Sequence, residues 1–143
     1  MVKRLSIVKG RDLDFGNIAV GNSPGTVTIT YDGAVVNGGV VSVSGSPHAA
    51  NFSGYGQYNR YISLRLDQAP IYVTRAGGSE RMRVRDFTIA SSPPTLLSTN
   101  AQYFRIGAPS GMFTFNVGAT LDVGARQAPG VYQGTFTVMI QYF

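Results

Sequence analysis

One histidine, His48, is the natural candidate for a general base in this chain of 143 residues. A hydrolase triad needs such a base beside a nucleophile, together with a third group that orients the base. His48 follows Ser46 and Pro47 in a sequence typical of a loop, and the chain has no cysteine. We therefore interpret His48 as a surface loop residue and predict no catalytic triad.

The acidic residues are few, and their spacing does not suit catalysis or metal binding. A glycosidase needs two carboxyl groups on either side of one bond, and Asp12 and Asp14 are the closest candidates. Residues i and i+2 of a strand share a face, so both carboxylates are expected on the solvent side, opposite Leu13 and Phe15. Metal sites need clustered ligands, but the seven acidic residues are dispersed. The glycine-rich stretches match no phosphate-binding loop or dinucleotide fingerprint. We predict neither an enzyme nor a metal or cofactor site.

Two groups of side chains are suited to binding a ligand on the surface. Three arginines alternate along residues 81–85, where guanidinium groups on one face could hold phosphates or an anionic glycan. The alternative, which we favour, is that the arginines are only the polar outer residues of a strand that buries Met82 and Val84. Like charges along an exposed strand also prevent it from pairing with the edge of another sheet. Three tyrosines within residues 55–61 could stack on sugars or bases, although tyrosine is common in exposed turns. The candidate surface-binding patch comprises Tyr55, Tyr58, Tyr61, Arg81, Arg83 and Arg85.

The charge balance is moderately basic, with a formal net charge of +5 and a sequence pI near 9.8. A basic balance can indicate a nucleic-acid partner. Because the excess is modest and spread along the chain, we predict no nucleic-acid partner. The absence of cysteine excludes disulfides and thiolate metal sites. No apolar run reaches the roughly 18 residues of a membrane span, so we predict none.

The start of the chain resembles an export signal only in part. Lys3 and Arg4 give it positive charge, and an apolar stretch follows. That stretch stops at Lys9, short of the roughly 7–15 apolar residues of a signal peptide. If the protein is exported, the sequence is therefore a mature or trimmed form that lacks its signal peptide.

The elements that must position these side chains are strands. Apolar and polar residues alternate with a period of two, which is typical of strands with one buried face. The clearest segments are residues 4–9, 26–31, 60–67, 81–89, 113–123 and 132–142. We predict that the last two form long antiparallel strands joined by a turn near 124–130. No segment carries a helical pattern with caps, and residues 90–101 are predicted to form a loop.

Many short strands separated by Gly, Pro and Asn turns are typical of a β-sandwich or barrel. The charged fraction of 13% is about half of the usual ~25%, which suits a strand-rich exterior covered by hydroxyl and amide groups. The sequence contains no linker, repeat or change in composition. We predict a single all-β domain over residues 1–143.

Three segments resemble a known bacterial family when taken in order. They are Asp12-Leu13-Asp14-Phe15-Gly16-Asn17-Ile18 with residues 25–29, then residues 115–121, and finally residues 130–142. These segments are similar to the family catalogued as domain of unknown function 4402 and to the spore coat protein U-type pilins of archaic chaperone–usher pili. The resemblance spans nearly the whole chain and is weakest over residues 53–112.

The resemblance implies an immunoglobulin-like, pilin-like β-sandwich that lacks one strand, in a secreted protein of the cell surface. In such pilins the resulting groove is filled first by a chaperone strand and then by the N-terminal extension of the next subunit. Main-chain hydrogen bonds then give affinity, and alternate side-chain pockets give register. The implied partners are further copies of the chain in a polymer, a periplasmic chaperone and an usher. The implied groove-lining residues are Phe136, Val138, Ile140 and Tyr142.

One departure from the family concerns the donor strand. Members usually carry a further alternating segment before the strand that corresponds to residues 5–8, where this chain has only Met1 to Arg4. Three interpretations are open. The donor segment was trimmed away, or this member does not polymerise in that way, or the donor or first strand is formed by Leu5, Ile7, Leu13 and Phe15.

Two functional hypotheses follow from the sequence. The first is a structural subunit of a bacterial surface filament or fimbria that assembles by β-strand addition. The alternative is a surface adhesin or glycan-binding module of the same fold, which does not polymerise and uses the candidate surface-binding patch. A small β-sandwich hydrolase is disfavoured, because the chain offers no catalytic residues.

Overall fold

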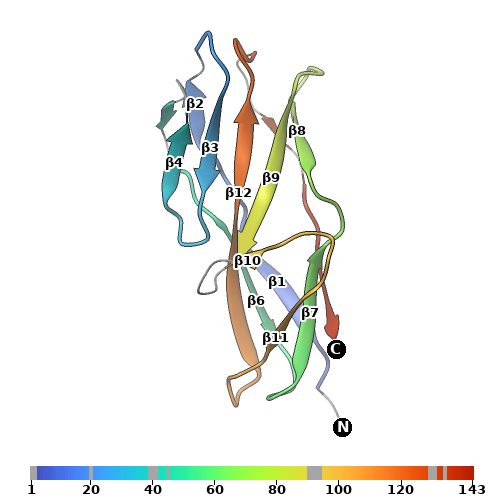
Figure 1. Ribbon diagram of the computed structural model, residues 1–143. Coiled ribbons are helices and arrows are strands. Elements are labelled where there is room, and N and C mark those ends of the chain that lie inside the picture. Colours follow the sequence, from blue (N-terminus) through green and yellow to red (C-terminus); the bar gives the residue numbers. More distant parts are fainter. Residues whose placement is uncertain are drawn as a thin grey trace.

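Every regular element of the computed structural model is a β-strand, over the described residues 3–19, 21–38, 42–44, 46–89, 95–128, 132–133 and 135–143 (Figure 1). The strands are β1 (Ser6–Arg11), β2 (Asn17–Ala19), β3 (Gly25–Ile29), β4 (Val35–Gly38), β5 (Ser42–Ser44), β6 (Ala50–Tyr55), β7 (Tyr61–Leu66), β8 (Ile71–Arg75), β9 (Arg81–Ile89), β10 (Thr95–Leu96), β11 (Gln102–Arg105), β12 (Met112–Val123), β13 (Tyr132–Gln133) and β14 (Val138–Tyr142). The predicted all-β fold is confirmed.

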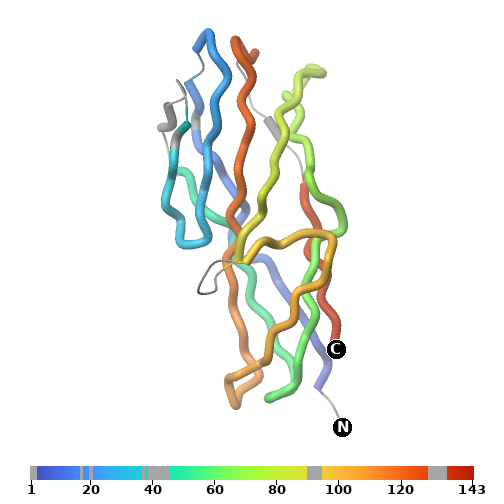
Figure 2. The backbone as a smooth tube through the Cα atoms, in the orientation of Figure 1, coloured from blue at the N-terminus to red at the C-terminus, as the bar shows by residue number. Residues whose placement is uncertain are grey.

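The strands form an antiparallel sandwich. The larger sheet has the order β1-β6-β12-β9-β8-β13, with β3, β4 and β10 paired beside this path. A three-stranded sheet, β11-β7-β14, packs against it across the core, and β2 pairs with β5 separately. The beginning of β1 and the end of β14 lie at the same end of the molecule (Figure 2). The chain is thus a β-sandwich whose first and last strands belong to different sheets.

β12 is the central strand of the larger sheet. Its first half pairs with β6 and its second half with β3 on the same edge, while β9 pairs along the opposite edge. Gly118 lies where the partner changes from β6 to β3, and a Cβ there would collide with the carbonyl oxygen of Ile29. Only glycine allows the two backbones to approach so closely. The predicted strand over residues 113–123 is confirmed.

The buried face of β9 changes phase in the middle of the strand. Met82 and Val84 point into the core, as predicted, but the next buried residues are Phe87 and Ile89. Asp86 has a φ of 54°, and the register with β12 shifts at this point. A β-bulge inserts one residue and restores the inward direction of the side chains.

The predicted hairpin between residues 113–123 and 132–142 is wrong. β13 pairs with β8, and β14 pairs with β7 in the opposite sheet, so neither pairs with β12. The alternation over residues 136–142 correctly predicted which side chains face inward, but it carries no information about the neighbouring strand. The last segment therefore crosses from the larger sheet to the smaller one.

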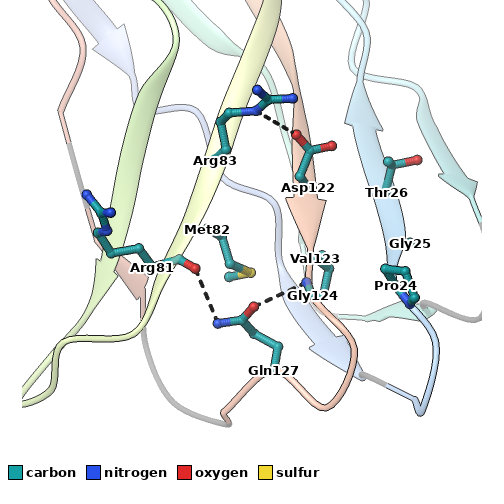
Figure 3. Close-up of a pocket in the computed structure, with 10 residues that line it drawn as sticks. All are labelled: Pro24, Gly25, Thr26, Arg81, Met82, Arg83, Asp122, Val123, Gly124 and Gln127. Atoms are coloured by element: carbon teal, nitrogen blue, oxygen red, sulfur yellow. Dashed lines mark hydrogen bonds and ion pairs between the residues drawn. The ribbon is translucent and has the colours of Figure 1, made fainter.

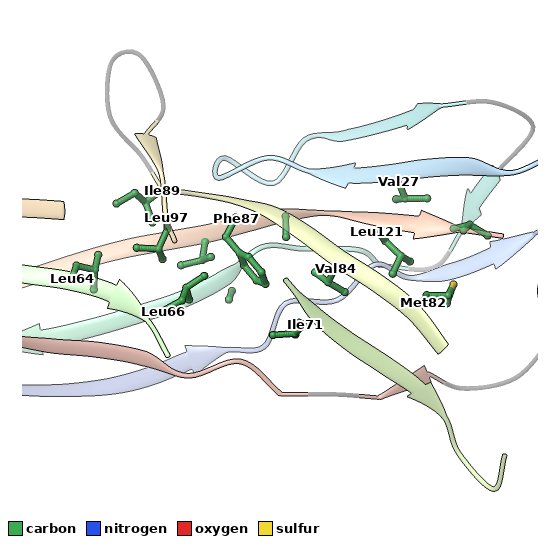
Figure 4. Packing of buried hydrophobic residues seen from close by; sticks show 14 residues of the cluster. Val27, Leu64, Leu66, Ile71, Met82, Val84, Phe87, Ile89, Leu97 and Leu121 are labelled. Atoms are coloured by element: carbon green, nitrogen blue, oxygen red, sulfur yellow. The ribbon is translucent and has the colours of Figure 1, made fainter. Parts of the chain in front are cut away.

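The core lies between the two sheets and is almost wholly aliphatic (Figure 4). β12, β9 and β7 supply most of it, and the side chains that they bury are nearly inaccessible to solvent. Phe87 is its largest fully buried side chain. The buried cluster comprises Val27, Ala50, Leu64, Leu66, Ile71, Met82, Val84, Phe87, Ile89, Leu97, Val117, Ala119, Leu121 and Val123.

Candidate assembly site at the seam between the first and last strands

The inner face of β14 is only half-buried, although it faces the core. Val138, Ile140 and Tyr142 lie opposite Leu66, Leu64 and Ile62 of β7. The three residues of β7 are fully buried, whereas their partners on β14 remain partly exposed. If another strand lay on the far side of β14, the inner side chains of β14 would be covered as fully as the side chains of β7 opposite them. β14 is the edge strand of its sheet, so its inner side chains lack cover on one side.

The backbone of β14 presents hydrogen-bonding groups on the same uncovered side. The amide of Phe143 donates to the carbonyl of Tyr61, and the amide of Asp67 donates to the carbonyl of Thr137. Because antiparallel pairing alternates from residue to residue, Val138, Ile140 and Tyr142 direct their N–H and C=O groups away from β7. The residues with half-buried side chains therefore also carry the outward-pointing backbone groups.

The other side of this region is formed by the beginning of the chain. β1 is the edge strand of the larger sheet, and the start of the chain approaches the end of β14, where the Tyr142 hydroxyl contacts Lys3. Among residues 3–19, no side chain that the structure describes is fully buried. We call the region between β1 and β14 the seam, lined by Leu5 and Ile7 on one side and by Phe136, Val138, Ile140 and Tyr142 on the other.

The hydroxyl of Tyr142 closes one end of the seam. It donates to the carbonyl oxygen of Lys3 at 2.5 Å and accepts from the amide of Gln57 at 2.7 Å. The Lys3 amide in turn donates to the side-chain oxygen of Gln57 at 3.2 Å. The guanidinium of Arg60 lies 5.1 Å from the centre of the Tyr142 ring. These contacts fasten the end of β14 to the start of the chain.

Aromatic rings form the floor of the seam. Phe52 of β6 stacks on Phe115 of β12 with ring centres 5.2 Å apart, and Phe136 meets the edge of Phe52 at 6.2 Å. Phe113 continues the row beside Phe115. Its ring fits there because residue 54 is glycine: a Cβ at residue 54 would lie only 2.5 Å from the Phe113 ring. Phe52, Phe113, Phe115 and Phe136 are all only half-buried. A contiguous, incompletely covered aromatic surface is typical of a site that binds a partner.

The predicted first-strand residues are folded into their own chain. Ile7 pairs with Gly54 of β6, and Leu13 and Phe15 follow β1 and pack against the core cluster. A donor role for Leu5 and Ile7 would therefore require β1 to leave β6.

His48 lies beside one carboxylate. Its backbone exchanges two hydrogen bonds with Asp14, and its ring nitrogen Nε2 is 3.8 Å from the Asp14 carboxylate. The ring also lies 3.4 Å from the carbonyl oxygen of Ala49. Within the described part of the chain, no group of three or more His, Cys, Asp or Glu residues is placed to hold a metal ion. In these same residues, no helix is long and apolar enough to cross a bilayer.

The predicted surface-binding patch is divided between the two ends of the sandwich. Tyr55 lies opposite Met112 and Arg83 opposite Asp122, at the two ends of β12. Ten residues of extended strand separate these positions, which is about 33 Å. The tyrosines and arginines therefore cannot bind one small ligand together.

The arginines of the patch are largely engaged with acidic and aromatic neighbours. Asp122 accepts from Arg85 at 2.8 Å and from Arg83 at 3.0 Å. The Arg85 hydrogen bonds, followed by those of Arg83, lower the pKa of Asp122 against the opposing effect of partial burial. Arg81 lies over the ring of Tyr72 at 4.5 Å. Arg81, Arg83 and Asp122 border a shallow depression of about 500 Å³ where β9 begins and β12 ends (Figure 3).

Comparison with known families provides one match. The family described as domain of unknown function (DUF4402) matches residues 5–142. The chain belongs to this family. No curated protein and no solved structure matches the chain closely enough to indicate a relationship. The predicted membership in this family is thus confirmed, and the family description names no activity.

Proposed function

We propose that this DUF4402 protein is a structural subunit of a bacterial surface filament, and that subunits assemble by β-strand addition at the seam. The observation that carries the proposal is the half-buried inner face of β14, opposite fully buried residues of β7. The resemblance of residues 130–142 to the last strand of spore coat protein U-type pilins points in the same direction. Such a subunit would be exported to the cell surface.

The chemistry of the seam suits an added strand better than a small ligand. Val138, Ile140 and Tyr142 direct apolar side chains inward at every second residue, while their backbone groups point to the free edge. An incoming strand would satisfy the backbone groups and insert alternate side chains over the aromatic floor. A long, apolar free edge is otherwise a hazard for aggregation.

The source of the added strand follows from the role of β1. Residues 6–11 already pair with β6, so they are available as donor only if β1 exchanges between copies. A segment of another copy or a chaperone strand would instead add to β14 and leave β1 in place. Strand addition by a dedicated chaperone and usher would deliver the subunit to the filament.

The test compares two neighbouring positions of β14. Arginine at Ile140 places a charge inside the seam, whereas arginine at Gln141 places it on the outer face. Light scattering across a concentration series, with electron microscopy of the largest species, measures assembly. We expect linear polymers from the unmodified chain and from Gln141→Arg, and monomers from Ile140→Arg that retain the strand signal in circular dichroism.

Two results would contradict the proposal. One is an unmodified chain that stays monomeric at every concentration and also when mixed with a large excess of its own unfolded copies. The other is assembly that Gln141→Arg blocks and Ile140→Arg leaves unchanged, because the contact would then use the outer face of β14.

A further inference from the structure

The outer face of the three-stranded sheet carries exposed aromatic rings that the proposed assembly does not use. Tyr61 of β7 is 50% exposed, Tyr103 of β11 is 52% exposed and Phe143 is 75% exposed. They alternate with the inward residues of the same strands, so they point away from the core and from the seam. We call this surface the aromatic face, comprising Tyr61, Arg65, Tyr103, Arg105, Met139 and Phe143.

Register places these side chains together. Tyr103 lies opposite Ser63, Arg105 lies opposite Tyr61, and Met139 lies opposite Arg65. The Tyr103 and Phe143 rings come from the two outer strands, which lie about 9.6 Å apart across β7. Their ring centres are nevertheless only 4.5 Å apart. The two rings therefore lean toward each other above the central strand, and Ser63 is 6% exposed.

The opposite outer face at the same end of the molecule has a different chemistry. There β6 and β12 direct Asn51, Ser53, Thr114 and Asn116 outward, and the Asn51 amide donates to the Asn116 side chain at 2.8 Å. The same face also carries Tyr55 and Met112, which lie opposite each other and are 53% and 45% exposed. It thus presents one exposed ring beside polar side chains, whereas the aromatic face groups three rings, as is typical of an interaction site.

The charged side chains on the three strands of the aromatic face are Arg65 and Arg105, and β7, β11 and β14 contain no acidic residue. Asp67 follows β7 on the same face, two residues beyond Arg65 and six residues from Tyr61, the partner of Arg105. The end of the face around Arg105 and Tyr61 is therefore the more positive one. One guanidinium nitrogen of Arg105 donates to the Asn59 side-chain oxygen at 2.6 Å. That contact uses one of five donors and fixes the group beside Tyr61, with further donors available for an anion.

We propose that the aromatic face binds an acidic polysaccharide, with sugar rings lying on Tyr61 and Tyr103 and their carboxylates held by Arg65 and Arg105. The face is the outer surface of a three-stranded sheet, so it suits an extended chain of sugars and differs from the enclosed pockets that bury small ligands. Guanidinium groups match the geometry of carboxylates. This inference does not depend on the proposed filament, because the seam and the aromatic face lie on opposite sides of β14.

A single-stranded nucleic acid fits the same surface less well. Sequence-independent binding of a nucleic acid uses a positively charged groove that follows the phosphates, with bases stacked on open ring faces. The aromatic face supplies two arginines on the open surface of a three-stranded sheet. Guanidinium groups match the geometry of single carboxylates, so two arginines suit a carboxylated sugar chain better than a phosphate backbone that must be followed along its length.

The test uses the monomeric protein with polygalacturonate as the acidic polysaccharide, dextran as a neutral one and oligo(dT) as the nucleic acid. Tyr103→Ala and Arg105→Ala change the face, and Tyr61→Ala provides a second aromatic variant. Tyr72→Ala is the matched control, because Tyr72 is also exposed and contacts an arginine, but lies on β8 in the other sheet. Circular dichroism and thermal unfolding confirm that each variant is folded.

We expect polygalacturonate to bind and dextran to bind weakly or not at all. Tyr103→Ala and Arg105→Ala should each weaken binding about tenfold, the change in Kd that about 1.4 kcal/mol produces, and Tyr72→Ala should bind like the unmodified protein. The proposal is overturned if polygalacturonate does not bind, or if Tyr72→Ala weakens binding equally. It is also overturned if oligo(dT) binds more tightly at the same face, or if Tyr103→Ala only abolishes self-association.

Discussion

Replacing Ile140 by alanine in the isolated chain should cost much less stability than replacing Leu64, its direct neighbour on β7. Leu64 is 2% exposed, and Leu→Ala changes at such positions cost about 2–5 kcal/mol, because the transfer free energy is lost and a cavity remains. Ile140 lacks cover on one side. Its replacement should cost about 1–2 kcal/mol, because part of the side chain is in water before the change.

Urea unfolding of the monomer measures this difference. With a urea dependence of about 1–3 kcal/mol per molar, a gap of about 2 kcal/mol separates the two midpoints by about 1 M. The chain has no tryptophan, so circular dichroism or tyrosine fluorescence follows the transition. Met139→Ala, on the outer face of the same strand, measures how much free energy of unfolding is lost through the lower strand propensity of alanine. That loss is subtracted from the effect of Ile140→Ala.

The comparison can refute the reasoning directly. If Ile140→Ala and Leu64→Ala lower the free energy of unfolding equally, the inner face of β14 is already covered in the monomer. An incoming strand would then bury nothing further at this position. Should the cost of Ile140→Ala instead rise toward that of Leu64→Ala after assembly, the added burial lies at the seam.

Two further predictions concern the fold. Asp122→Asn should lower the free energy of unfolding by about 1 kcal/mol at neutral pH, since the pKa of Asp122 is held below its ordinary value of 3.8 mainly by Arg85 and then by Arg83. This stabilisation is present above the unfolded pKa and is lost as the pH falls through the lower folded pKa, so the variant and the parent should converge in urea titrations once the pH lies below that folded pKa. Gly118→Ala should destabilise the protein by about 3 kcal/mol or more, because its Cβ would meet the backbone of Ile29 and Thr30. At Gly107 a Cβ would meet only the end of the Arg105 side chain, at an ordinary contact distance of 3.9 Å. Gly107→Ala should therefore be nearly neutral in the same thermal unfolding experiment, and equal effects at the two glycines would disprove the close approach of β3 and β12.

The face of most strands could be predicted from the sequence, but the partners of the strands could not. Alternation over residues 60–67 and 81–85 correctly placed Leu64 and Val84 inside, because side chains alternate between faces in any strand. The same alternation over residues 132–142 suggested pairing with β12. Pairing depends on contacts between distant residues, and β14 lies beside β7.

The candidate sites, too, could be predicted from the sequence only in part. Phe136, Val138, Ile140 and Tyr142 could be identified from their period and from the family resemblance, but their incomplete burial depends on the position of β1 and β14 at sheet edges. The aromatic face was missed because Tyr103 and Phe143 are forty residues apart and meet only across β7. In the sequence, nothing near Tyr103 or Phe143 distinguishes an exposed aromatic residue that belongs to a group from one that is isolated.

Hydrogen exchange at single residues of β14 tests the central claim most directly. In the isolated chain, the amides of Val138 and Ile140 point to the free edge and should exchange quickly, whereas those of Met139 and Gln141 point to β7 and should be protected. In assembled particles, all four should exchange slowly, because an added strand accepts the two outward hydrogen bonds. Protection of Val138 and Ile140 in the monomer, or their continued fast exchange after assembly, would contradict strand addition at the seam.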